Sequence, residues 1–283
     1  MKKSYEDNIA RLKTELGEGE SFDVVVRPLR VMGKKAALIC IDGFAKDDIL
    51  TEVMEFLLLL RREIIGASIH KTLLTKGIPY IETNTEQQIE KVLQAVLSGA
   101  IILIVDGCDE AFIIDARTYP AREPAEPDVE RVVRGSRDGF TETLVFNTAL
   151  LRRRIRDNRL RIKLFTVGQR SKTDVCVCYL QDICNPDLVN TISERINNIN
   201  IDGIPMAEKS VEEFIVGGSN WNPYPRVRYT ERPDVAATHL FEGHVIIIVD
   251  TSPSVMIAPV TYFHHVQHAE EYRQEPLIGL YIR

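Results

Sequence analysis

The sequence predicts an α/β fold made of two similar α/β subdomains, each a mixed sheet flanked by helices. Three observations favour it. A hairpin followed by a helix occurs once in each half of the 283 residues. A uniformly apolar strand ending in aspartate also occurs twice, at 99–106 and 243–250. A proline-rich stretch separates the halves. Such an order, repeated with similar spacing, indicates tandem duplication.

The first half begins with a polar segment, 1–19, which we predict to be a helical lead-in. Two β-branched runs follow, 22–31 and 36–42, with Gly33 between them, as is typical of a β-hairpin. Apolar residues then recur at helical spacing after Asp47 or Asp48. Thr85 and Gln88 are spaced as a capping box ahead of a second apolar stripe, and strands at 99–106 and 111–115 complete the half.

The second half repeats this order. Segments 161–167 and 173–181 form a predicted hairpin, and Asn185 with Pro186 predicts a capped helix start. The strand at 243–250 follows the strand at 99–106 by 144 residues, and the hairpin and helix blocks are 139 residues apart. The alternative is that any two buried strands look alike.

Prolines 120, 124 and 127 interrupt the chain between the halves, because proline removes a backbone donor and fixes φ. We therefore place the linker here and expect two domains, 1–125 and 126–283.

The composition is that of a globular protein, with 45% apolar and 27% charged residues and a net charge of −6. The N-terminal residues do not have the pattern of an export signal. No apolar run reaches the length of about 20 residues that a membrane-spanning helix needs, so we do not expect the given sequence to cross a membrane. Five cysteines, at 40, 108, 176, 178 and 184, are interpreted as reduced, buried thiols rather than zinc ligands.

Charge is concentrated between Arg131 and Lys163, where ten basic and three acidic residues give a local charge of +7. The rest of the chain then carries −13. A segment this basic seeks an acidic partner, for which another copy of the protein, nucleic acid and anionic lipid are the alternatives, or it is a solvated face. Only two aromatic residues lie within it, so nucleic acid is disfavoured.

Within this segment, a loop at 134–142 precedes a predicted helix with Leu144 on its apolar face. Arginines at a helix N-terminus can bind an anion, although no P-loop spacing is present. The favoured alternative is that Arg134 and Arg137 pair with carboxylates such as Asp138 and Glu142 to fix a domain junction.

No enzyme signature emerges. Asp106 and Asp250 each end a buried strand, yet each also begins a turn, which is sufficient reason for aspartate. His264, His268 and Glu271 share one face of a predicted helix, but this is the polar face of an ordinary amphipathic helix. We predict no catalytic residues, no metal and no cofactor.

Six motifs resemble, in order, those of the A-subunit family of bacterial spore germination receptors, the GerA-type family. They lie at 134–142, 147–157, 168–173, 229–234, 249–253 and 267–272. The resemblance implies two cytosolic α/β subdomains ahead of a helical membrane domain that oligomerises as an ion channel in the inner spore membrane. The family pattern runs on beyond Arg283, so we expect the chain to be the soluble part of a longer protein.

From this resemblance we expect a non-enzymatic assembly and gating region on the cytoplasmic side, with homo-oligomer and companion spore membrane proteins as partners and no nucleic acid. Electrostatic contacts between subunits or subdomains are assigned to Arg134, Arg137, Arg153 and Arg156. Glu231, Arg232 and Asp234 are assigned to a polar joint leading toward the membrane. The alternative is a small-molecule binding module with a cleft between the subdomains.

Overall fold

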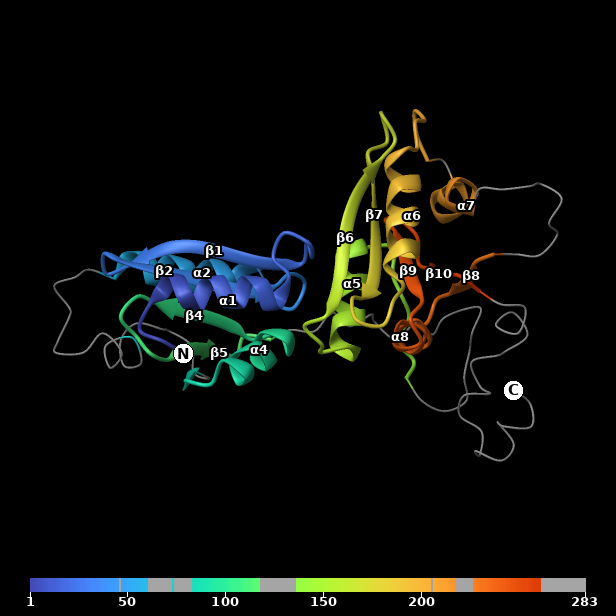
Figure 1. Ribbon diagram of the computed structural model, residues 1–283. Coiled ribbons are helices and arrows are strands. Elements are labelled where there is room, and N and C mark those ends of the chain that lie inside the picture. Colours follow the sequence, from blue (N-terminus) through green and yellow to red (C-terminus); the bar gives the residue numbers. More distant parts are fainter. Residues whose placement is uncertain are drawn as a thin grey trace. The chain divides into compact units, whose positions relative to one another are not determined.

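The chain forms two compact units, each with its own sheet (Figure 1). The structure is a computed structural model that describes residues 1–45, 47–60, 73, 83–117, 136–204, 206–216 and 226–260. Unit 1 comprises Met1–Pro120 with Arg156–Arg159, and unit 2 comprises Ala121–Ile155 with Leu160–Arg283. The predicted linker lies mostly in 118–135, outside the described residues, so the boundary near residue 125 stays a prediction.

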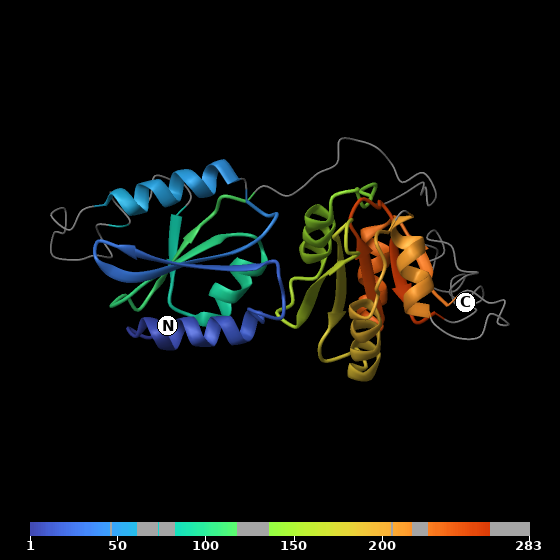
Figure 2. The same cartoon turned by 90° about the horizontal axis from the view of Figure 1, so that it is seen from above.

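Unit 1 is a five-stranded sheet in the order β1-β2-β4-β5-β3, with helices on both faces. Its elements are α1 (Tyr5–Leu16), β1 (Val24–Val31), β2 (Lys34–Ile41), α2 (Asp47–Leu59), β3 (Thr83–Glu86), α4 (Ile89–Leu97), β4 (Ile101–Val105) and β5 (Ala111–Ile114). Figure 2 shows α2 on one face of the sheet and α1 and α4 on the other. Because both faces are covered, β4 is buried along its whole length, which explains its uniformly apolar sequence.

Local signals fix the first elements of unit 1. The Ser4 side chain accepts a hydrogen bond from the Asp7 amide, and Gly17 ends α1 in the left-handed conformation at φ 71°. Met32 and Gly33 both have positive φ, 51° and 80°, as a two-residue type I′ hairpin turn requires. The predicted lead-in helix and first hairpin are therefore both present.

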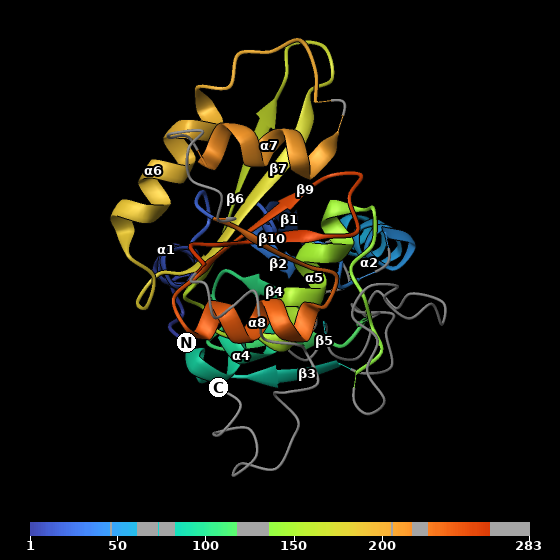
Figure 3. The same ribbon diagram turned by 90° about the vertical axis from the view of Figure 1, so that its right-hand side faces the viewer.

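Unit 2 has the strand order β6-β7-β9-β10-β8. Its elements are α5 (Leu144–Arg154), β6 (Leu160–Val167), β7 (Thr173–Leu180), α6 (Pro186–Asn197), α7 (Ala207–Val216), β8 (Arg228–Thr230), α8 (Pro233–Phe241), β9 (Val245–Val249) and β10 (Val255–Ala258). Figure 3 shows α6 and α7 on one face of this sheet and α5 and α8 on the other. Asn185 caps α6 by accepting from the Asp187 amide, with Pro186 at the first helical position, as predicted.

The two units repeat each other down to single hydrogen bonds. In unit 1 the buried Asn8 side chain accepts from the Lys2 amide at 2.9 Å and donates to the Lys2 carbonyl at 2.6 Å. In unit 2, 139 residues later, Asn147 makes the same two bonds to Thr141, at 2.7 and 2.6 Å. We call this pair of hydrogen bonds, from one asparagine side chain to the amide and carbonyl of the residue six positions earlier, an asparagine bracket. Two buried strands that merely look alike would not be accompanied by the same bracket in each unit. The duplication predicted from spacing alone is thus present in the packing.

The predicted α/β class is confirmed, but the sheets are antiparallel rather than mixed at every strand pair among the described residues. Strands β3 and β4 run in the same direction and are joined through α4, a sequence order that predicts parallel neighbours. Strand β5 inserts between them and pairs antiparallel with both. Unit 2 repeats this arrangement, with β10 between β8 and β9.

The predicted capping box at Thr85 and Gln88 is wrong. Thr85 lies in β3, where it pairs with Phe112, and the N-cap of α4 is Gln88, without a side-chain cap. The Glu86 carboxylate instead accepts from the amides of Gln87 and Gln88, both at 2.9 Å. These bonds, led by the one from Gln88, hold the pKa of Glu86 below its usual value.

All five cysteines are free and buried, in agreement with the interpretation as reduced thiols. Burial, with a smaller contribution from the nearby Asp42 charge, raises the pKa of Cys40 to about 11. A thiol of this kind is an inert packing group at neutral pH.

Candidate functional site

The three consecutive arginines at the end of α5 lie in three different environments. The Arg152 side chain is fully buried, Arg154 is half-buried, and Arg153 is exposed. Successive helical positions point about 100° apart, so one run of identical residues reaches the core, the flank and the surface. Only part of the basic segment is therefore available as a charged surface.

Arg154 forms an ion pair with Asp138, at 2.5 Å, within unit 2. The Ser136 hydroxyl also donates to Asp138, and Arg154 donates to that hydroxyl at 3.0 Å. Burial alone would raise the pKa of Asp138, but the hydrogen bonds from Arg154 and Ser136 outweigh it and lower the pKa. The carboxylate is thus held charged as a structural tie between the segment before α5 and the end of that helix.

Arg232 is the most deeply buried charged residue of the predicted joint. Its side chain is 1% exposed and forms a bidentate ion pair with the Asp234 carboxylate, with N···O distances of 3.1 and 2.8 Å. The same guanidinium donates to the Ser136 carbonyl at 2.9 Å, and the Phe140 amide donates to the Glu231 carbonyl at 2.8 Å. We call Ser136, Asp138, Arg154, Arg232 and Asp234 the polar joint of unit 2. A buried ion pair of this kind is costly to break, because one charge is then left uncompensated.

The other predicted site residues are dispersed. Arg134 lies outside the described residues. Arg137, Glu142 and Arg153 are exposed on unit 2, and Arg156 is exposed on unit 1. Glu231 contributes its backbone carbonyl to the joint. The structure therefore brings Asp138, Glu231, Arg232 and Asp234 together and places Arg137, Glu142, Arg153 and Arg156 at the surface.

Sequence reasoning missed Arg152 and Arg154, and it also missed a second role of Asp250. Arg152 follows Thr148 by four residues, so helical spacing already placed it on the buried face of α5. Nothing in the local sequence identified Arg154 as the partner of Asp138. The Asp250 carboxylate accepts from the Leu144 amide at 3.1 Å, so the first turn of α5 already has an anionic partner from its own chain.

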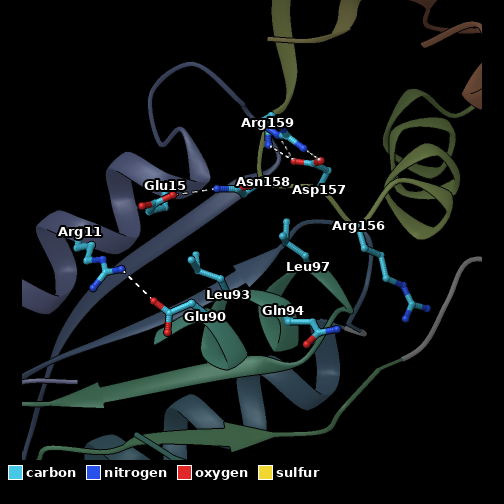
Figure 4. A pocket seen from close by; sticks show the side chains of 10 residues that line it. All are labelled: Arg11, Glu15, Glu90, Leu93, Gln94, Leu97, Arg156, Asp157, Asn158 and Arg159. Atoms are coloured by element: carbon cyan, nitrogen blue, oxygen red, sulfur yellow. Dashed lines mark hydrogen bonds and ion pairs between the residues drawn. The ribbon is translucent and has the colours of Figure 1, made fainter. Parts of the chain in front are cut away.

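Unit 1 contains an open pocket of about 590 Å³ (Figure 4). It is lined by α1, α4 and the segment Arg156–Arg159, through residues Arg11, Glu15, Glu90, Leu93, Gln94, Leu97, Arg156, Asp157, Asn158 and Arg159. Arg11 pairs with Glu90 at 3.1 Å, and Asn158 donates to Glu15 at 2.9 Å. The Arg156 side chain extends away from the other lining groups. The lining of the pocket thus combines ion-paired side chains of both signs with the apolar side chains of Leu93 and Leu97.

The histidine face predicted at His264, His268 and Glu271 lies in 261–283, outside the described residues. Across the part of the chain that the structure describes, no helix has the length and apolarity needed to cross a bilayer.

The fold and its polar joint define a class of protein, a tandem α/β duplication whose buried charges tie its own segments together. Residues 10–283 match the family described as Bacillus/Clostridium GerA spore germination protein, and the chain belongs to this family. The predicted resemblance is confirmed, and so is the expected absence of enzymatic activity, because subunits of this family are non-enzymatic.

Named relatives refine this assignment. The chain is 51% identical over 278 residues, 96% of its length, to stage V sporulation protein AF of Bacillus subtilis, and covers 55% of that protein. It is 32% identical to the uncharacterized membrane protein YfkQ and 30% identical to spore germination protein KA, both of Bacillus subtilis. The match to YfkQ includes 99% of this chain and 54% of that protein. The match to protein KA includes 95% of this chain and 49% of that protein. The chain thus spans about half the length of these proteins.

A solved structure shows which half. The crystal structure of the N-terminal domain of the A subunit of the Bacillus megaterium spore germinant receptor GerK3 matches with a TM-score of 0.67 at 26% identity. The match covers 93% of this chain and 97% of that domain. The chain therefore corresponds to the N-terminal domain of a GerA-family spore germination or sporulation membrane protein.

Proposed function

We propose that this domain is a cytoplasmic assembly and gating region of an oligomeric ion channel in the inner spore membrane. Its membership of the GerA family and its match to an A-subunit N-terminal domain support this role. The relatives are about twice as long as the chain, which leaves room for a membrane domain in the full protein.

The observation that carries the proposal is the division of the α5 arginines. Arg152 is buried and Arg154 is paired with Asp138, so the fold itself accounts for both. Arg153 and Arg137 are exposed on the same unit. An exposed arginine can pair with a carboxylate of a second copy or of a companion spore membrane protein, and the chain outside 131–163 carries a net charge of −13.

In this proposal the polar joint couples movements of the α5 surface to α8. Arg232 ties the segment before α5 to the start of α8 through Ser136 and Asp234. A displacement of the exposed α5 surface by a partner would then be passed to α8 through buried bonds rather than absorbed by a loose loop. We assign to Glu231, Arg232 and Asp234 this coupling toward the membrane.

Charge reversal tests the assembly role. We expect Arg153→Glu in the full-length protein to reduce oligomer size in native gels and in analytical ultracentrifugation, because attraction to an acidic surface becomes repulsion. Circular dichroism should be unchanged, since the side chain is exposed. The matched control is Arg170→Glu at the tip of the β6–β7 hairpin, also exposed, which should leave the oligomer intact. An unchanged complex size for Arg153→Glu would refute the proposal.

The pocket in unit 1 favours a second candidate function, binding of a small polar molecule. Its volume of about 590 Å³ is within the usual range for ligand sites, and its charges of both signs suit a zwitterion. A thermal-shift screen with amino acids, sugars, dipicolinate and nucleotides tests this, because a ligand at about 100 times its Kd stabilises by about 2.7 kcal/mol. A flat screen would reject it.

A further inference from the structure

The end of α8 brings together three side chains of the kinds that bind transition metals. His239 lies in the last turn of the helix, Glu242 is its C-cap, and His244 follows two residues later. One ligand atom from each lies within 4.8 Å of the others. The His239 side chain is fully buried, whereas Glu242 is 46% exposed and His244 is half-buried. Two imidazoles and one carboxylate form a ligand set typical of zinc with an open fourth position.

The backbone holds these residues in place. The His244 amide donates to the His239 carbonyl at 3.0 Å, and the Gly243 amide donates to the Leu240 carbonyl at 3.1 Å. With Gly243 at φ 86°, these bonds form a Schellman cap. The two positions that normally make an apolar contact across such a cap are here His239 and His244, whose rings meet edge to face at 5.0 Å.

The duplication provides an internal comparison. Helix α4 of unit 1 ends in the same cap, with the Ala100 amide on the Ala95 carbonyl at 3.0 Å and the Gly99 amide on the Val96 carbonyl at 2.8 Å. The residues 144 positions before His239, Glu242 and His244 are Ala95, Ser98 and Ala100. The cap therefore forms without any of the three side chains, and a purely structural need does not explain them.

The orientation of the rings suits coordination. His244 donates from Nδ1 to the His239 carbonyl at 3.2 Å, which leaves the lone pair of that ring on Nε2. His239 Nδ1 donates to Glu242 Oε2 at 2.9 Å, so a metal bound between these two atoms takes the place of this proton, which is released on binding. The C-terminal end of a helix also favours a cation. Zinc-bound ligand atoms lie roughly 3.3 Å apart at bond lengths of about 2.0–2.1 Å, and rotation of the exposed Glu242 and half-buried His244 side chains can close this gap.

We infer that His239, Glu242 and His244 form a binding site for a divalent transition metal of the zinc type, with water as a fourth ligand. Nitrogen donors select zinc over calcium or magnesium, which prefer oxygen. The sequence predicted no metal here, because the spacing i, i+3, i+5 matches neither one helix face nor a familiar zinc motif.

Competition titration of Zn²⁺ against a chromophoric chelator, on the 283-residue chain, tests the site. We expect one zinc per chain and a rise in Tm on zinc addition. Glu242→Ser and His244→Ala should each weaken binding by at least about tenfold, the loss seen when even an outer-shell partner is removed. The combined variant His239→Ala, Glu242→Ser, His244→Ala reproduces the residues of unit 1 and should abolish both binding and the Tm shift.

The double variant His264→Ala, His268→Ala is the matched control, since it removes the two histidines that the sequence places four residues apart on one helix face, and it should bind as the wild type does. Retention of affinity in the combined variant, loss of affinity in the control, or no stoichiometric zinc in the wild type would each overturn the inference. If circular dichroism shows the combined variant unfolded, His244→Ala decides alone, and unchanged affinity there overturns the site.

Discussion

At the scale of single residues, the charged side chains of unit 2 are used mainly to tie the chain to itself. Arg232 reaches a carboxylate two residues away and a backbone carbonyl 96 residues earlier in the chain. Asp138 joins the segment before α5 to the end of that helix through Arg154. The residues most easily mistaken for a binding cluster in the sequence are therefore partly internal supports, and the exposed minority carries the proposed contact role.

Asp138 gives this conclusion a pH signature. Burial works against its charge, but hydrogen bonds from Arg154 and Ser136 leave its pKa below the unfolded value of about 3.9. A lowered pKa contributes stability above the unfolded value, and that contribution is lost as pH falls through the folded value. The free energy of unfolding of the wild type should therefore exceed that of Asp138→Asn at pH 7, with the difference shrinking between about pH 5 and pH 2.

Urea unfolding of both proteins across this range measures the difference. In an Arg154→Gln background the effect of Asp138→Asn should be smaller, because the main hydrogen-bond donor is gone. A difference that does not change with pH would contradict the assigned pairing.

At the scale of elements, the two asparagine brackets test how far the repeats are physically equivalent. Asn147→Ala removes both bonds to the Thr141 backbone and leaves a partly buried amide and carbonyl unsatisfied, so we expect a loss of about 2–3 kcal/mol in the free energy of unfolding. Asn8→Ala removes the matching bonds to the exposed Lys2, where water can replace them, so about 1 kcal/mol is expected. Chemical denaturation measures both, and an equal or reversed order would contradict the burial argument.

The same scale shows what could be predicted from the sequence. The hairpins, the buried strands β4 and β9 and the capped start of α6 follow from local patterns, because alternation, helical spacing and Asn-Pro are read within a few residues. The insertion of β5 between β3 and β4 depends on long-range pairing that local order does not encode. For the same reason the local spacing predicts a helix cap at Thr85, where the structure has a strand residue.

The candidate site divides in the same way. Arg232 and Asp234 are two residues apart, so their pairing was accessible to sequence reasoning, whereas Asp138 and Arg154 are brought together only by the fold. The group at His239, Glu242 and His244 depends on a helix ending at Phe241, since an uninterrupted helix would turn His244 away from His239.

At the scale of the whole molecule, duplication means that each repeat has a complete sheet and its own core. The core of unit 1 packs α2 against β2, β4 and β5, and that of unit 2 packs α6 and α7 against β7, β9 and β10. We therefore expect fragments 1–120 and 121–283 each to fold alone and to unfold in a single cooperative transition by scanning calorimetry and by urea. Each unit buries its own apolar core, and burial of apolar surface is the main stabilising term in folding. Fragment 1–120 lacks only Arg156–Arg159 of unit 1, whose Asn158–Glu15 bond is one partly exposed contact. In the intact chain, the substitution Glu15→Ala removes that bond. We expect it to lower the free energy of unfolding of the intact chain by no more than about 1 kcal/mol. A fragment 1–120 without a cooperative transition would show instead that the second repeat is required to complete the first.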